Sequence, residues 1–249
     1  MLRKTLFRLT LTGVAAIGAV NLAHAATVTG PYIGGQLGWG ATHAGLNDLP
    51  GKPSVNAIVN DINDPNTQWF NYSASHSSST GGLVGRIFVG YQFNPNWAAE
   101  LGYIKFKDEH FKGSYIGSGV NTSHVDDWVD VNYAYKGVVK EHAVDLVGKG
   151  ILPLENGFDL YGKLGIAYVQ QTAARTEAPA DSSTYTGEPY PGKRTVDTNK
   201  LLPEFGVGVS YDITPNVPVD LSWTHIQKTS GTIESADFVS LGLAYKFNA

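Results

Sequence analysis

The segment Phe238-Val-Ser-Leu-Gly-Leu-Ala-Tyr-Lys-Phe-Asn248 alternates between apolar residues and small or polar ones. Neighbouring side chains on a strand point to opposite faces, so this segment would have one apolar face and one small or polar face. The apolar face carries Val239, Leu241, Leu243, Tyr245 and Phe247. This alternation predicts a strand that presents one face to lipid.

Seven further segments alternate in the same way, at about 31–41, 80–93, 97–107, 138–152, 158–170, 201–213 and 217–228. Their mid-strand charges lie on the face opposite the apolar one, at Arg86, Glu100, Asp145, Lys149, Lys163 and Asp220. A soluble lipocalin-type barrel would place apolar residues inside and charges outside. The inverted pattern predicts an all-β fold, an eight-stranded antiparallel transmembrane β-barrel with a polar interior.

The connections between these segments alternate in length. Short turns are expected at Asn94-Pro-Asn96, at Pro153–Gly157 and at Thr214-Pro-Asn216, since Asn, Pro and Gly suit turn dihedrals. Long polar loops are expected at about 42–79, 108–137 and 171–200, with a shorter polar one at about 229–236. Outer-membrane barrels have short periplasmic turns and long outer loops, so we expect the long loops outside the cell.

The N-terminal residues 1–25 have the features of a cleaved secretory signal peptide. A basic start is followed by a short apolar run and by Ala23-His24-Ala25, a small-x-small cleavage pattern. The barrel would then occupy residues 26–249, with 15 basic and 22 acidic residues and a net charge of −7. This charge argues against nucleic acid as a partner. The absence of cysteine excludes disulfides and thiol catalysis.

Four stretches resemble the OmpA (outer membrane protein A) family: Val89–Tyr103, Phe158–Ile166, Val209–Asn216 and Ser240–Phe247. The resemblance covers strands and short turns and is absent from the long loops. It implies an eight-stranded up-and-down barrel in the outer membrane of a Gram-negative bacterium. Family members commonly continue into a periplasmic peptidoglycan-binding domain. Because the sequence stops at Ala249, we expect no such domain here.

The resemblance also implies that interior charges form salt bridges that plug the lumen and can rearrange into a small pore. By position, Glu100 matches an acidic member of that network, and Lys149 and Lys163 match basic members. Asp220 stands where the family has a base, and Arg86 is a candidate to supply the missing positive charge. A static plug and a gated pore both remain open.

The outer loops are the expected carriers of a specific function. Aromatic residues in a polar surround are typical of protein-contact hot spots. The loops contain such residues at Trp69, Phe70, Tyr72, Tyr115, Trp128, Tyr133, Tyr185 and Tyr190. They could contact a host-cell receptor, or they could belong to extracellular extensions of the strands and to the aromatic girdle.

Catalytic and metal sites are weaker hypotheses. His225, Ser230 and Glu234 could be cast as a hydrolase triad, but a rim histidine beside loop hydroxyls is the better explanation of them. The segments His124–Asp127, Asp108–His110 and Asp61–Asn66 contain possible metal ligands and are better explained as solvated loops. We therefore expect no enzyme activity, no metal and no cofactor.

The sequence predicts an outer membrane structural and surface protein whose loops contact host cells in the manner of an adhesin. The alternatives are a small ion channel gated by interior salt bridges and, more distantly, a barrel hydrolase. The expected partners are outer membrane lipid, including lipopolysaccharide, and a host receptor. Tyr245 and Phe247 are expected to act as a signal for the barrel assembly machinery.

Overall fold

The computed structural model describes residues 28–43, 67–79, 81–121, 128–179, 194–229 and 233–247. Almost all of these residues form β-strands, with a single 3-10 turn, η2 (Glu155–Gly157). The strands are β1 (Gly30–Thr42), β2 (Thr67–Ser79), β3 (Gly82–Asn94), β4 (Trp97–Lys105), β5 (Glu109–Asn121), β6 (Trp128–Pro153), β7 (Phe158–Pro179), β8 (Arg194–Thr214), β9 (Val217–Ile226) and β10 (Ala236–Lys246). Within these ranges no helix has the length and apolarity to cross a membrane.

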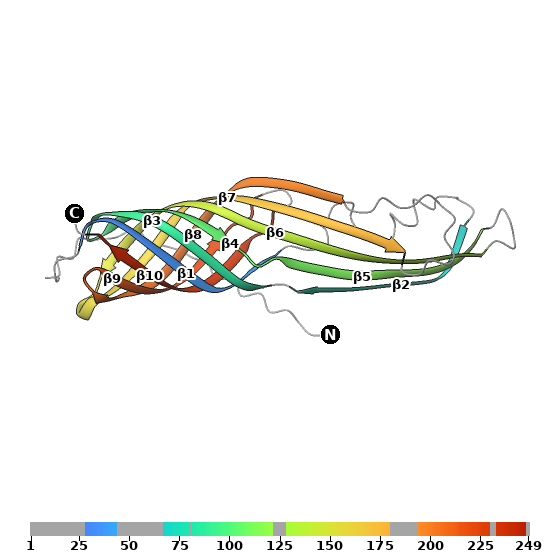
Figure 1. The fold of residues 1–249 in the computed structure, drawn as a ribbon, viewed down its shortest axis with the longest axis horizontal. Coiled ribbons are helices and arrows are strands. Elements are labelled where there is room, and N and C mark those ends of the chain that lie inside the picture. The colour runs from blue at the N-terminus through green and yellow to red at the C-terminus, as the bar shows by residue number, and fades with distance from the viewer. Residues whose placement is uncertain are drawn as a thin grey trace.

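Eight of the strands close into a barrel, whose shape is seen in Figure 1. Their order is β4-β3-β1-β10-β9-β8-β7-β6, and β6 pairs back with β4. Every neighbouring pair is antiparallel, and the first strand joins the last through Leu37↔Leu241 in a register that runs from Tyr32↔Lys246 to Thr42↔Ala236. The prediction of an eight-stranded antiparallel up-and-down barrel is confirmed.

The two faces of the strands separate as the alternation predicted. Outward residues such as Leu241, Ile87 and Leu37 are 69%, 67% and 58% exposed. On the same strands, Arg86 and Ser240 point inward and are buried. Such an apolar exterior would be unfavourable in water, so it requires lipid around the barrel.

The strands continue far beyond the barrel at one end. β6 pairs with β7 from Pro153↔Asp159 to Tyr133↔Pro179, which is about 65–70 Å of strand at ~3.4 Å per residue. Crossing a membrane takes only about 9–11 residues. β2 and β5 lie outside the barrel and extend the sheet in the order β2-β5-β6. We call β2, β5 and the projecting parts of β6, β7 and β8 the outer sheet (Figure 1).

Parts of the segments expected as loops are therefore strands. β2 occupies the end of the first segment, β5 and the start of β6 lie in the second, and the ends of β7 and β8 lie in the third. The three short turns are found where they were expected, at the opposite end of the barrel. There, the β3–β4 and β8–β9 connections are two residues long and η2 joins β6 to β7.

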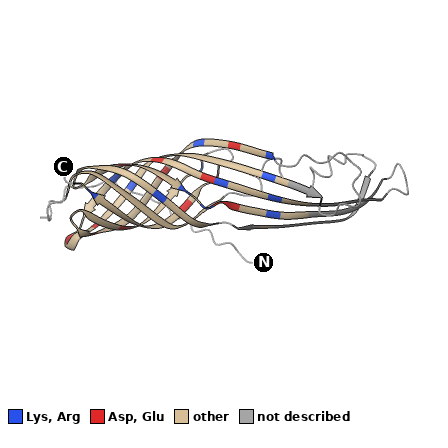
Figure 2. Ribbon diagram, in the orientation of Figure 1, with Lys and Arg blue, Asp and Glu red and all other residues tan. Residues whose placement is uncertain are grey.

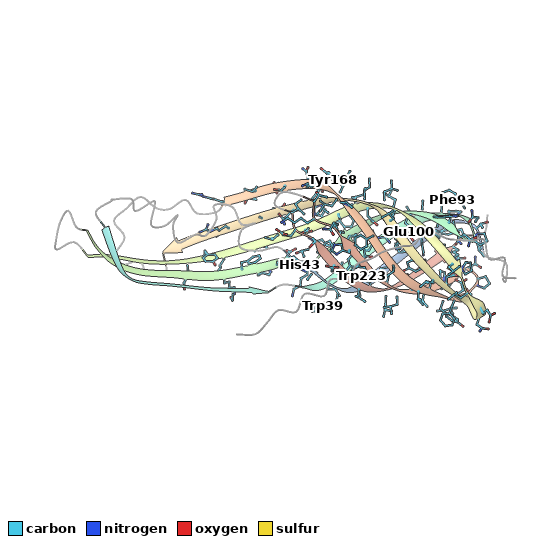
Figure 3. The ribbon with its side chains drawn as sticks, turned by 180° about the vertical axis from the view of Figure 1, so that it is seen from behind. Trp39, His43, Phe93, Glu100, Tyr168 and Trp223 are labelled. Carbon is cyan, nitrogen blue, oxygen red and sulfur yellow. The ribbon has the colours of Figure 1, made fainter. Side chains whose placement is uncertain are left out.

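Two girdles of exposed aromatic side chains mark the limits of the apolar exterior. Trp39, Tyr168 and Trp223 lie near the end from which the strands project, and Phe93 lies toward the turn end (Figure 3). The turn-end girdle also includes Tyr91, Trp97, Phe158, Tyr211, Tyr245 and Phe247. Aromatic rings favour both membrane–water boundaries, so the girdles define which part of the barrel lies in lipid.

Candidate functional site in the barrel lumen

Glu100 is the centre of a buried network of charges inside the barrel (Figure 3). Its Oε2 accepts hydrogen bonds from Arg86 Nη1 at 2.9 Å and from Lys163 Nζ at 3.0 Å. Its Oε1 accepts the Tyr32 hydroxyl at 3.1 Å and lies 3.7 Å from Lys149 Nζ. Four of the six predicted network residues thus come together, each from a different strand (β3, β4, β6 and β7): Arg86, Glu100, Lys149 and Lys163. Lys149 makes the longest of these contacts.

A second carboxylate, Asp145 on β6, is held by the same arginine. Arg86 Nε and Nη2 donate to Asp145 Oδ2 at 3.0 and 2.6 Å, and neither side chain is accessible to solvent. Gly102 makes room for this pair, because a Cβ at that position would collide with Asp145 Oδ1 and lie 2.8 Å from Arg86 Nε. Glycine is needed here because the ion pair fills the space of a side chain.

Asp220 joins the network through neutral groups. Its Oδ2 accepts hydrogen bonds from Gln36 Nε2 at 2.8 Å and from the Tyr161 hydroxyl at 2.9 Å. Gln36 Oε1 in turn accepts from Arg86 Nη1 at 3.3 Å. Arg86 on β3 thus provides positive charge to the network, whereas the resemblance placed a base on β9. Among the described residues no ion pair involves Asp220.

An apolar layer closes the lumen between the charge network and the outer sheet. Its buried members are Val84, Ile104, Phe106, Ala143, Ala167, Val169, Leu202, Ile226, Ile233, Ala236 and Phe238. On each barrel strand that contributes to the layer, an inward apolar residue lies next to the charge network on the side of the outer sheet. The sequence reasoning missed this layer, although the inward positions Val84, Ile104 and Leu202 are visibly apolar.

On the turn side of the network the lumen retains a small polar cavity. It leaves about 30 Å³ for the centres of water molecules, which is room for only a few waters. Its lining includes Glu100, Lys149, Lys163, Asp220 and Lys246. The charges therefore meet water on the turn side and an apolar layer on the other.

The proposed hydrolase residues do not assemble into a triad among the described residues. His225 Nδ1 lies 2.8 Å from Asp237 Oδ1, and Glu234 forms an ion pair with Lys228. Ser230 lies outside the described residues.

The possible metal ligands are likewise not brought together. Asp108 forms ion pairs with Lys105 at 3.3 Å and Lys140 at 3.7 Å. The segments His124–Asp127 and Asp61–Asn66 lie outside the described ranges. Within those ranges no group of three or more His, Asp or Glu could hold a metal ion.

The predicted contact aromatics fall mostly on the outer sheet. Trp69, Phe70 and Tyr72 lie on β2, Tyr115 on β5, and Trp128 and Tyr133 on β6. Tyr185 and Tyr190 lie outside the described residues. At the turn end, Tyr245 and Phe247 face outward with ring centroids 5.0 Å apart.

A lipid-facing apolar exterior, two aromatic girdles and buried interior charges define an eight-stranded outer membrane β-barrel. The family model of the OmpA-like transmembrane domain matches residues 26–249, and the chain belongs to this family. It is therefore a protein of the Gram-negative outer membrane that crosses the bilayer with several strands.

Relatives of this chain are found in several bacteria. An uncharacterised protein of Coxiella burnetii is 28% identical over 270 residues, covering 99% of this chain and 100% of the relative. Outer membrane protein A of Salmonella typhi is 26% identical and covers 94% of this chain, but only 53% of the relative. The chain thus spans about half the length of that protein.

Solved structures of similar fold include Neisserial surface protein A, with 13% identity and a TM-score of 0.44. Another is Ail, the attachment invasion locus protein of Yersinia pestis, with 14% identity and a TM-score of 0.41. In both cases 88% of this chain and 99% of the other are covered.

Proposed function

We propose that the protein is a structural barrel of the outer membrane whose outer sheet makes adhesin-like contacts with host cells or other partners outside the cell. The observation that carries the proposal is the length of the projecting strands. In β6 and β7 about half of the paired residues exceed what a membrane crossing needs. Ordered backbone pairing at that distance from the bilayer would present a broad surface to the outside.

The closed lumen supports a structural role for the barrel itself. Glu100, Arg86, Asp145 and Lys163 form ion pairs with one another at 2.6–3.0 Å, and an apolar layer separates them from the outer side. A buried charge network with several partners holds the strands in one register, because no member can leave without stranding another. The barrel would thus serve as a rigid base for the outer sheet.

The aromatic residues of the outer sheet are the proposed contact points. β2, which carries Trp69 and Tyr72, pairs with β5, which carries Tyr115. β5 in turn pairs with β6. Large aromatic side chains contribute most of the binding energy in protein interfaces, at about 2 kcal/mol or more for each hot spot. Aromatic residues on adjacent strands could therefore form one contact surface.

Attachment of bacteria to host cells tests this proposal. Bacteria that display the wild-type chain should attach to cultured host cells more than bacteria with an empty vector. A variant with W69S, Y72S, Y115S and W128S should lose this attachment. Attachment by the wild type no greater than by the vector would contradict the proposal.

A matched control separates contact from folding. F93S and Y211S remove exposed aromatic residues from the turn-end girdle, which would face the periplasmic side. Equal amounts of heat-modifiable barrel at the cell surface should be found for all variants, and the control should attach as wild type does.

A small ion channel is the second candidate, favoured by the water-sized cavity beside Lys149. Lys149 is the most exposed and most distant of the three bases around Glu100. Its displacement would open the turn side of the lumen first. Conduction would also require the apolar layer to become wet, so any openings should be small and rare.

We also propose two partners for the barrel itself. The lipid-facing exterior would contact lipopolysaccharide in the outer leaflet. Tyr245 and Phe247, which lie side by side on the outer face of the last strand, would be read by the barrel assembly machinery. Replacing both with Ser should reduce the amount of folded barrel in the outer membrane, whereas the same change at Tyr91 and Phe93 should not.

A further inference from the structure

The lipid-facing exterior is interrupted by a groove over two outward glycines. Gly35 on β1 lies opposite Ile87, and Gly85 on β3 lies opposite Leu37. A Cβ at Gly35 would meet only one atom, at 3.8 Å, and a Cβ at Gly85 only one, at 4.0 Å. Neither glycine is required by crowding, in contrast to inward Gly102, so both leave open space on the outside.

The groove has a volume of about 680 Å³ and slants across β10, β1, β3 and β4. Its side walls are almost entirely apolar and are formed by Leu37, Ile87, Tyr103, Leu241 and Leu243. Lys105 lines one end of it. The shape and chemistry suit an extended hydrocarbon chain with a charged group near Lys105.

Lys105 lies at the outer boundary of the membrane. It lies eight residues after Trp97 of the turn-end girdle, at the other end of β4, which corresponds to a height of about 20 Å for a strand tilted by ~40°. The apolar band of an outer-membrane barrel is about 25 Å tall. Lys105 also follows Tyr103 on the outward face, so its ammonium group lies at the level of lipid headgroups.

Further basic residues surround Lys105 on the outward faces of the neighbouring strands. His142 lies directly opposite Lys105, and Lys140 reaches the same carboxylate, Asp108. Higher up, Lys112 and Lys136 lie directly opposite one another and are both exposed. Like charges in that position repel, so an anion between them would be stabilising. We call Lys105, Lys112, Lys136 and Lys140 the lysine patch.

Acidic residues are mostly on the other face of these strands. Glu109 and Glu141 alternate with the lysine patch and are buried. Basic and acidic positions both lie along the strands that leave the barrel (Figure 2). On the outward side, Asp108 pairs with two lysines through exposed contacts, and Asp197 lies two strands away from Lys140. Exposed pairs of this kind are weak, and a multiply charged anion could displace Asp108.

We propose that the groove and the lysine patch form a binding site for a phosphorylated glycolipid of the outer leaflet, with an acyl chain in the groove and phosphate on Lys105 and Lys140. The lipid A portion of lipopolysaccharide has this chemistry. The inference deepens the proposed contact of the barrel with lipopolysaccharide and is independent of the proposed contact with host cells. A second copy of the chain is a poorer occupant, because a symmetric contact would bring two lysine patches together.

Binding of lipid A to the full folded protein tests the site. The purified barrel in non-ionic micelles would be titrated with bisphosphorylated lipid A and with the same lipid after removal of both phosphates, and the complexes counted by native mass spectrometry. Lysines beside an anionic lipid contribute about fivefold in affinity each. K105Q with K140Q should therefore weaken binding about 25-fold, and the dephosphorylated lipid should not distinguish the variant from wild type.

The groove is tested separately by filling it. G85V places a β-branched side chain in the open space and should weaken binding of the phosphorylated lipid by roughly two- to fivefold through lost van der Waals contacts. The matched controls are K228Q, a lysine on the far side of the rim, and G162V, an outward glycine outside the groove. Both should bind as wild type does.

Three results would overturn the proposal. The first is equal affinity of wild type and K105Q/K140Q for bisphosphorylated lipid A. The second is competition by a sulfated oligosaccharide at equal affinity, which would make the patch a receptor for soluble polyanions. The third is a stable dimer in the same micelles that is lost in G85V. Host-cell attachment should be unchanged in K105Q/K140Q. A loss of lipid A binding in this variant can then be distinguished from a loss of the proposed adhesion.

Discussion

Replacing Arg86 with methionine should destabilise the barrel more than replacing any other base of the lumen. Arg86 provides both hydrogen bonds to Asp145 Oδ2 and one of the two close contacts to Glu100 Oε2. Asp145 is completely buried and has no other ion pair among the described residues. Without Arg86, its charge would remain in the lumen with no base beside it.

The magnitude follows from the burial of the pair. Removing one partner of a buried ion pair costs about 3–5 kcal/mol, whereas replacing both by apolar groups of similar shape is often neutral. R86M should therefore lower the free energy of unfolding by about 3–5 kcal/mol. R86M with D145L should recover most of this loss, because leucine has the shape of aspartate and Glu100 keeps Lys163. K149M should cost below about 1 kcal/mol, since Lys149 is more exposed and 3.7 Å from Glu100.

Equilibrium unfolding by urea in phosphatidylcholine vesicles, followed by tryptophan fluorescence, measures these differences. The slope of the unfolding free energy against urea concentration should be the same for the wild type and the variants. A shift of the unfolding midpoint then reports a change in stability. A cost below about 1 kcal/mol for R86M, or a double variant less stable than R86M, would refute the reasoning that Asp145 depends on this arginine.

Three further predictions follow from the packing and the faces of the strands. G102A should lower the free energy of unfolding by about 1–3 kcal/mol in the same assay, because the added methyl group displaces the Arg86–Asp145 pair. G85A, on the open outer face, should leave it nearly unchanged. Equal losses in the two variants would show that the inward site is not crowded. L241R should make insertion into vesicles less favourable by about 2–4 kcal/mol, and unimpaired insertion would mean that Leu241 does not face lipid. In planar bilayers the wild type should be closed for most of the time and K149A should show more frequent small openings; a large steady current from either would contradict a lumen closed by the apolar layer.

The barrel could be predicted from the sequence because each crossing strand must satisfy lipid on one face. That requirement leaves a period-two pattern that is visible at Leu37, Ile87 and Leu241 without any partner strand. It also fixes the inward position of the charges, so Arg86, Glu100, Asp145 and Lys163 could be assigned to the lumen. Their pairing could not be predicted, because it depends on the stagger between strands, which places Arg86 against both Glu100 and Asp145.

The outer sheet was harder to predict because no lipid constrains it. β2 reads Thr-Gln-Trp-Phe-Asn-Tyr-Ser-Ala-Ser-His-Ser-Ser-Ser, with no sustained apolar face, and is stabilised by pairing with β5. The same composition is typical of a polar loop. The apolar layer was missed for a different reason. A polar lumen is the usual expectation for an outer-membrane barrel, and Val84, Ile104 and Phe238 depart from it only near one end of their strands.

The placement of the outer sheet outside the cell is the claim on which the proposed function depends. The chain has no cysteine, so single cysteines can be introduced and labelled with a membrane-impermeant maleimide in intact bacteria. Ser77 on β2 and Glu155 on η2 are both exposed; Ser77 lies in the outer sheet and Glu155 lies at the turn end of the barrel. S77C should be labelled in intact cells, and E155C only after the outer membrane is permeabilised. Labelling of E155C in intact cells, with S77C protected, would contradict the proposed orientation and the surface function built on it.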